Sequence, residues 1–144
     1  MYAVTVETHQ VGVNVVYVDG DLVHTVCLGE TTLAMCKEFF VLVERVLLAK
    51  GRVFLISDTS KTIAITRDAR RYITEWSKTH RLTGVANVVV SPVARAMLTL
   101  VTGAMKLLGQ PTSRSIFVST LGEAQAWVAA QREDYFRLNP SAPR

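Results

Sequence analysis

Residues 85–109, VANVVVSPVARAMLTLVTGAMKLLG, contain two elements whose order decides the fold class. The first six residues, 85–90, are mostly β-branched and apolar, which is typical of a strand covered on both faces. Ser91 is a good helix N-cap, Pro92 suits the first helical position, and Gly109 suits a left-handed cap at the helix end. The stretch therefore predicts a buried strand followed by a helix of about five turns.

The predicted helix over 92–108 carries more apolar surface than packing against one core requires. At about 100° per residue, the polar side chains fall within an arc of about 60°. They are Arg95, Thr99, Thr102 and Lys106. Apolar or small side chains fill an arc of about 220°, twice the stripe that such a helix needs. They are Met97, Leu98, Leu100, Val101, Ala104, Met105, Leu107 and Leu108.

Part of this apolar arc is expected to pack on the sheet of the same chain. The flank left over is either the side of Leu107 and Leu108 or the side of Leu98 and Met105. It is covered by another part of this chain, a second subunit, a hydrophobic ligand or a membrane surface.

Strand and helix patterns alternate along the rest of the chain. Apolar alternation and turn residues predict strands over about 2–8, 13–18, 22–26, 53–56, 85–90 and 116–118. Apolar periodicity and capping residues predict helices over about 31–50, 67–82, 92–108 and from 120 onward. This order predicts an α/β sandwich: a mostly parallel sheet of four to five strands with an N-terminal hairpin and four helices. We expect one domain over residues 1–137 and a flexible tail over 138–144.

Composition excludes several classes of protein. The net charge of +4 is spread along 144 residues, without the concentrated basic patch of a nucleic-acid binder. No secretory signal and no apolar run of membrane-spanning length occurs, so we expect a cytoplasmic protein. Cys27 and Cys36 are too few for a disulfide framework and are expected to be inert. His9, His24 and His80 lack zinc-site spacing, and no glycine-rich phosphate loop occurs, so no metal or cofactor is expected.

Polar residues follow the predicted buried strands, where ligands usually bind in parallel sheets. Asp58 and Ser60 lie in the polar loop over 57–61, directly after the strand over 53–56. This loop is either an anion cradle or nucleophile loop at a helix start, or a turn whose short side chains bond their own backbone. The residues alone leave both interpretations open.

The pattern resembles the STAS domain family, and most closely its SpoIIAA-like branch. Three stretches carry the resemblance: RVFLISD over 52–58, VANVVV over 85–90, and SIFVSTLGEAQAWV over 115–128. The first is similar to the family's central strand that ends in aspartate, and the last is similar to the branch's ending with Glu-Ala-x-x-Trp. The resemblance implies a STAS/SpoIIAA-like sandwich.

The same resemblance implies a regulatory or binding domain that is not an enzyme and is often dimeric, with hydrophobic ligands or membrane association in the SpoIIAA-like branch. Anti-sigma-factor antagonists of the wider family carry a phosphorylated serine before the second helix. Here that place holds Thr66-Arg67, so phosphorylation there is not expected.

Together these observations predict a binding domain that engages a protein partner, including a second copy of itself as a homodimer, or a hydrophobic small molecule or lipid. The predicted contact residues lie on the third helix and the Asp58 loop: Met97, Leu98, Leu100, Val101, Met105, Leu107, Leu108, Asp58 and Ser60. The alternative is peripheral association with the inner face of a membrane, with Arg95 and Lys106 reaching anionic head groups.

Overall fold

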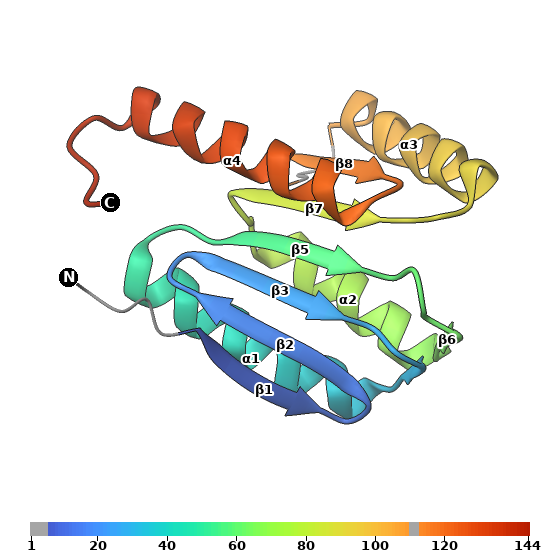
Figure 1. Cartoon of the computed structure of the whole chain (residues 1–144). Helices are drawn as coiled ribbons and strands as arrows, with labels where there is room; N and C mark the ends of the chain where they lie inside the picture. The colour runs from blue at the N-terminus through green and yellow to red at the C-terminus, as the bar shows by residue number, and fades with distance from the viewer. Residues whose placement is uncertain (1–5, 110–112) are drawn as a thin grey trace.

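The computed structural model describes residues 6–109 and 113–144, which form two sheets and four helices (Figure 1). The strands are β1 (Glu7–Val11), β2 (Asn14–Asp19), β3 (Leu22–Val26), β4 (Glu30–Thr31), β5 (Phe54–Asp58), β6 (Ala64–Ile65), β7 (Gly84–Val88) and β8 (Ser115–Val118). The helices are α1 (Leu33–Lys50), α2 (Arg67–Thr79), α3 (Pro92–Leu107) and α4 (Leu121–Leu138).

The main sheet has the strand order β1-β2-β3-β5-β7-β8. Strands β1, β2 and β3 pair antiparallel, whereas β3, β5, β7 and β8 pair parallel to one another. Strands β4 and β6 form a separate two-stranded parallel sheet. The predicted α/β class, the N-terminal hairpin and the mostly parallel sheet are confirmed.

Two predicted boundaries are wrong. The first described strand, Glu7–Val11, ends beyond the predicted end at residue 8, because the turn at Gly12 (φ 58°) sets the pairing of Val11 with Asn14; residues 2–5 of the predicted strand lie outside the described residues. Helix α2 ends at Thr79 rather than Leu82. His80 adopts an extended conformation, and its ring stacks on the Trp76 ring with centroids 4.1 Å apart, which directs the chain out of the helix.

Helices α1 and α2 cover one face of the sheet, as Figure 1 shows. The core between them is built from valines of the hairpin and the apolar stripes of both helices. Its largest helical members are Phe40 and Trp76, whose rings stack with centroids 4.2 Å apart. The opposite face of β5, β7 and β8 is covered by α4, through a second core of Phe54, Ile56, Ala86, Val88, Val118, Ala124 and Val128.

Helix α3 differs from the other three helices because none of its residues is buried. It lies at the β8 edge of the sheet and makes its main contacts with that strand (Figure 1). No side chain of its apolar arc is buried, and the part of the arc that is least exposed is the flank of Leu98 and Met105. The half-buried residues of α3 are Ala94, Arg95 and Thr102, so the side turned toward the sheet lies where the polar arc meets the Leu98 and Met105 flank.

Candidate functional site

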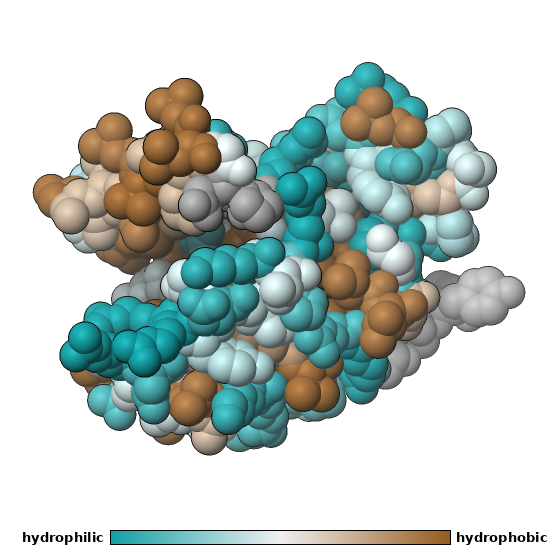
Figure 2. All heavy atoms as spheres, turned by 180° about the vertical axis from the view of Figure 1, so that it is seen from behind, coloured by the Kyte–Doolittle hydropathy of each residue, from teal (hydrophilic) through white to brown (hydrophobic). Residues whose placement is uncertain are grey.

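Many of the exposed large apolar side chains of the described chain lie on α3. Six side chains, which we call the outward face, are between 57% and 90% exposed: Val93, Met97, Leu100, Val101, Leu107 and Leu108. Figure 2 shows apolar side chains gathered over this helix, standing out from the body of the molecule. These residues include five of the contact residues that the sequence predicted on this helix.

The other flank of α3 is closer to the body. Leu98 and Met105 are 39% and 38% exposed, about half the value of the outward leucines. Thr102 lies about 40° from Leu98 on the helical wheel and is half-buried, as is Arg95. The flank left uncovered is therefore the side of Leu107 and Leu108, one of the two alternatives that the sequence left open.

Helix α3 is defined at both ends by capping residues, although none of its side chains is buried in a core. The Ser91 hydroxyl accepts a hydrogen bond from the Ala94 amide at 3.2 Å, and Pro92 occupies the first turn. Gly109 has a positive φ of 74° after the last turn. These are the caps that the sequence predicted, so the helix begins and ends as expected although its orientation is not the expected one.

The Asp58 loop is a turn closed on itself. One oxygen of the Asp58 carboxylate accepts hydrogen bonds from the Ser60 amide at 3.0 Å and from the Ser60 hydroxyl at 2.6 Å. The Thr59 hydroxyl donates to the Val88 carbonyl at 2.7 Å, which fixes the loop to β7. The polar groups thus bond within the loop and its neighbouring strands, as the turn interpretation predicts. Asp58 and Ser60 are tied to β5 and β7, whereas α3 packs mainly on β8.

The cysteines lie in surroundings that disfavour reactive chemistry. Burial raises the pKa of the Cys27 and Cys36 thiols, which keeps both protonated and therefore poor nucleophiles. Burial also lowers the pKa of His24, against the opposing effect of the nearby Asp58 carboxylate. Within residues 6–109 and 113–144, no group of three histidine, cysteine or acidic side chains is placed to hold a metal ion.

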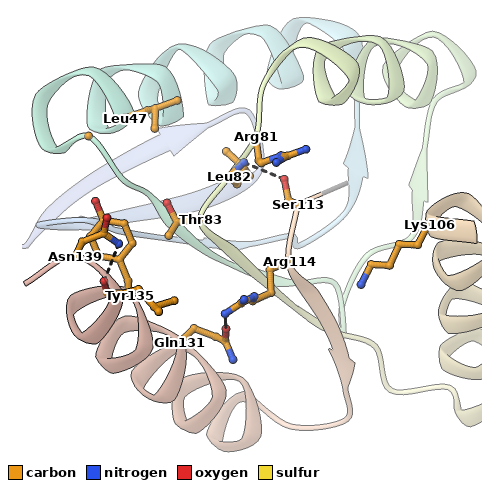
Figure 3. A pocket seen from close by; sticks show the side chains of 12 residues that line it. Leu47, Arg81, Leu82, Thr83, Lys106, Ser113, Arg114, Gln131, Tyr135 and Asn139 are labelled. Atoms are coloured by element: carbon orange, nitrogen blue, oxygen red, sulfur yellow. Dashed lines mark hydrogen bonds between the residues drawn. The ribbon is translucent and has the colours of Figure 1, made fainter. Parts of the chain in front are cut away.

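A pocket of about 560 Å³ lies at the amino ends of β5, β7 and β8 (Figure 3). It is lined by Leu47, Gly51, Arg81, Leu82, Thr83, Lys106, Ser113, Arg114, Gln131, Tyr135, Leu138 and Asn139. Sequence reasoning placed ligands at the carboxyl ends of the strands and missed this pocket. Its lining residues come from several separate segments of the chain, so the sequence carries no spacing signal for it.

The same fold occurs in a solved structure, an uncharacterized protein of the DUF3478 family with a SpoIIAA-like fold from Shewanella loihica PV-4. The two share 12% sequence identity over 88% of this chain and 94% of that chain, with a TM-score of 0.57. The chain has a SpoIIAA-like fold. No protein-family model matches the sequence, and no curated protein matches it.

At 12% identity the likeness shows the shared SpoIIAA-like fold alone and carries no functional residue from one chain to the other. Among the described residues, none of the helices combines the length and the apolar character needed to cross a membrane. The features of this SpoIIAA-like chain that bear on function are therefore the outward face of α3 and the pocket at the amino ends of the strands.

Proposed function

We propose that this chain is a cytoplasmic, non-enzymatic binding domain that pairs with a second copy of itself through the outward face of α3. The observation that carries the proposal is the orientation of this helix. Its polar Arg95 and Thr102 are half-buried, while Leu107 on the far side is 90% exposed. Apolar surface in water costs about 25 cal/mol per Å², so a helix in this orientation gains stability when something covers it.

The shape of the surface favours a protein over a small hydrophobic ligand. Small molecules bind in concave sites that enclose most of their surface. The outward face instead projects from the molecule (Figure 2), with Leu100 74% and Leu108 79% exposed. A projecting apolar helix packs against another helix or sheet by inserting its side chains between those of the partner.

The chemistry of the surface favours a second copy of this chain. The outward face has no charged and no hydrogen-bonding side chain, so two copies can face each other about a two-fold axis without placing like charges together. Six to eight apolar side chains at roughly 100 Å² each approach the ~800 Å² per partner that a standard interface buries. The outward face with the Leu98 and Met105 flank is therefore large enough for a dimer.

Membrane association is the competing interpretation, and the position of the two cations of α3 counts against it. A helix lying in a membrane surface places its cations beside the apolar face, where they reach head groups. Arg95 lies on the side turned toward β8, and its Nε atom is buried with no hydrogen-bond partner among the described residues. Lys106 lines the pocket at the amino ends of the strands. Neither cation flanks the outward face.

The test is the oligomeric state of the full chain and of a charge-bearing variant. We expect sedimentation velocity to give a dimer for the wild type and a folded monomer for Leu107→Glu, because a carboxylate at the interface is desolvated without a partner. The matched control is Leu48→Glu on α1, where the native side chain is 86% exposed, close to the 90% of Leu107. This control should remain dimeric.

Three results would overturn the proposal. One is a wild type that stays monomeric over about a hundredfold range of concentration. Another is Leu107→Glu unfolding the chain, which would place that side chain in its own core. The third is a monomer that sediments with phosphatidylglycerol vesicles and loses this binding in the same variant, which would establish the membrane interpretation.

A further inference from the structure

The pocket at the amino ends of β5, β7 and β8 is lined by three cationic side chains: Arg81, Lys106 and Arg114. They come from three separate segments: the α2–β7 connection, the last turn of α3 and the residue just before β8. None of the described residues that line the pocket is acidic. Figure 3 shows Arg114 near the middle of the pocket and Lys106 extending from α3 toward it.

These cations differ from the exposed arginines of the chain that form ion pairs. Arg45, Arg137 and Arg144 each pair with a carboxylate, at Glu7, Asp134 and Glu133. Among the described residues, Arg81 and Lys106 have no such partner, and Arg114 donates a hydrogen bond only to the neutral Gln131 amide oxygen, at 2.9 Å. Three like charges around one pocket repel one another, and an anion between them removes that repulsion.

The uncharged residues that line the pocket indicate what the uncharged part of a ligand would contact. Leu47, Tyr135 and Leu138 supply apolar surface, and Thr83 and Asn139 supply polar groups. Figure 3 shows Thr83 and Asn139 on the same side of the pocket as Leu47 and Tyr135. The volume of about 560 Å³ lies within the roughly 300–1,000 Å³ typical of small-molecule sites. The pocket therefore has a cationic part and a mixed apolar and polar part, with room for a molecule of mononucleotide size.

We propose that this pocket binds an organic phosphate. Arg114 and Lys106 contact the phosphate oxygens, Arg81 adds a third positive charge, and the surface near Tyr135 accepts the organic part. Arginine suits this role because its planar guanidinium donates two parallel hydrogen bonds to phosphate oxygens. The site is distinct from the outward face of α3, and its occupancy does not depend on the pairing of two copies.

The first test is an NMR titration of the isotope-labelled full chain with adenosine monophosphate, with adenosine as the neutral control. We expect shifts confined to the amides of residues near 81–83, 113–115 and 131–139 for the nucleotide and none for adenosine. Arg114→Gln should weaken binding at least tenfold, whereas the matched control Arg71→Gln, an exposed arginine on α2, should leave binding unchanged.

Each alternative outcome is decisive. Equal shifts with adenosine, no shifts with the nucleotide, or equal weakening by Arg71→Gln would overturn the proposal, since each removes the role of the phosphate or of this pocket. Titration with inorganic phosphate and with phosphatidylglycerol vesicles then distinguishes a free organic phosphate from a lipid head group. If Arg81→Gln, which leaves the bond to Gln131 intact, weakens nucleotide binding severalfold, the loss in Arg114→Gln is not a packing effect.

Discussion

Helices α2 and α3 are both amphipathic, and they turn opposite faces to solvent. Helix α2 buries Ala69 and Trp76 and exposes Arg67, Arg70 and Arg71. Helix α3 half-buries Arg95 and Thr102 and exposes its leucines. Both helices begin with a side-chain cap, so local signals do not explain the difference. What differs is the surface beneath: α2 lies over the middle of the sheet beside α1, whereas α3 contacts mainly the edge strand β8.

The largest difference expected from this comparison is in the cost of removing one large apolar side chain. Trp76 stacks on Phe40 and donates its indole N–H to Glu44 at 3.1 Å, so Trp76→Ala should destabilise the chain by about 3–5 kcal/mol. Leu100→Ala on α3 should change the free energy of unfolding of the monomer by less than about 0.5 kcal/mol. Urea denaturation of dilute protein measures both values. A loss above about 2 kcal/mol for Leu100→Ala would show that α3 packs on its own core.

The next effect concerns α4, which is held to the sheet by a buried ion pair that α3 lacks. The Asp21 carboxylate accepts hydrogen bonds from Arg52 at 2.7 Å and from Arg132 of α4 at 3.1 Å, and Arg52 is 4% exposed. Asp21→Asn should cost about 1.5–3 kcal/mol, because the variant loses the negative charge that balances the two guanidinium groups and keeps an acceptor oxygen at only one of the two carboxylate positions. Thermal unfolding at neutral pH measures the loss. An unchanged midpoint of thermal unfolding would show that the ion pair of Asp21 makes no net contribution to the stability of the fold.

Low pH should remove much of the difference in stability between the wild type and Asp21→Asn. Burial acts to raise the pKa of Asp21, but the hydrogen bonds from Arg132 and Arg52 outweigh it and hold the pKa below 3.8. A carboxyl with a lowered pKa in the folded state stabilises the fold above its unfolded pKa and loses this contribution as pH falls through the folded value. The gap in stability between wild type and Asp21→Asn should therefore narrow between about pH 5 and pH 2. A gap independent of pH would contradict this assignment.

Much of the fold was predictable because its signals are local. Capping residues mark the predicted helix starts: Thr66, Ser91 and Thr120 each accept a hydrogen bond from the amide three residues later. Apolar strand runs and right-handed crossovers then restrict the order of the sheet. The rotation of α3 was not predictable, because an apolar arc of about 220° contains more than one stripe that can face a sheet.

The basic pocket was not predictable for a different reason. Lys106 and Arg114 are close in sequence to apolar segments and show no motif, and Gln131 lies on another helix. They line one pocket only because α3, β8 and α4 meet at the same end of the sheet. A site assembled from the ends of several elements leaves no spacing signal in the sequence. Its detection required the tertiary structure.

A smaller expected effect is on the rate at which the backbone amides of α2 and α3 exchange with solvent. Amides of α3 should exchange with solvent faster than those of α2 in dilute protein, because no buried side chain holds α3 in place. If two copies pair through the outward face, raising the concentration about a hundredfold should slow exchange in α3 and leave α2 unchanged. Hydrogen exchange followed by mass spectrometry resolves the two helices. Equal protection of α2 and α3 at every concentration would remove the distinction between them.

The smallest effect expected comes from Gly103, in the middle of α3. A Cβ atom placed there meets no atom within 4 Å outside the backbone of its own helix, so Gly103→Ala should stabilise α3 by about 0.5–1 kcal/mol. Because α3 opens separately from the core, this gain should appear as roughly two- to fivefold slower exchange in α3 and not in the global midpoint. The matched control is Gly122→Ala in α4, where the added Cβ also has open space. Helix α4 is packed on the sheet, so there the gain should appear in global unfolding.

If Gly103→Ala instead weakened self-association, Gly103 would lie at a close contact between the two copies, and the paired surface would extend from the outward face around to this side of the helix.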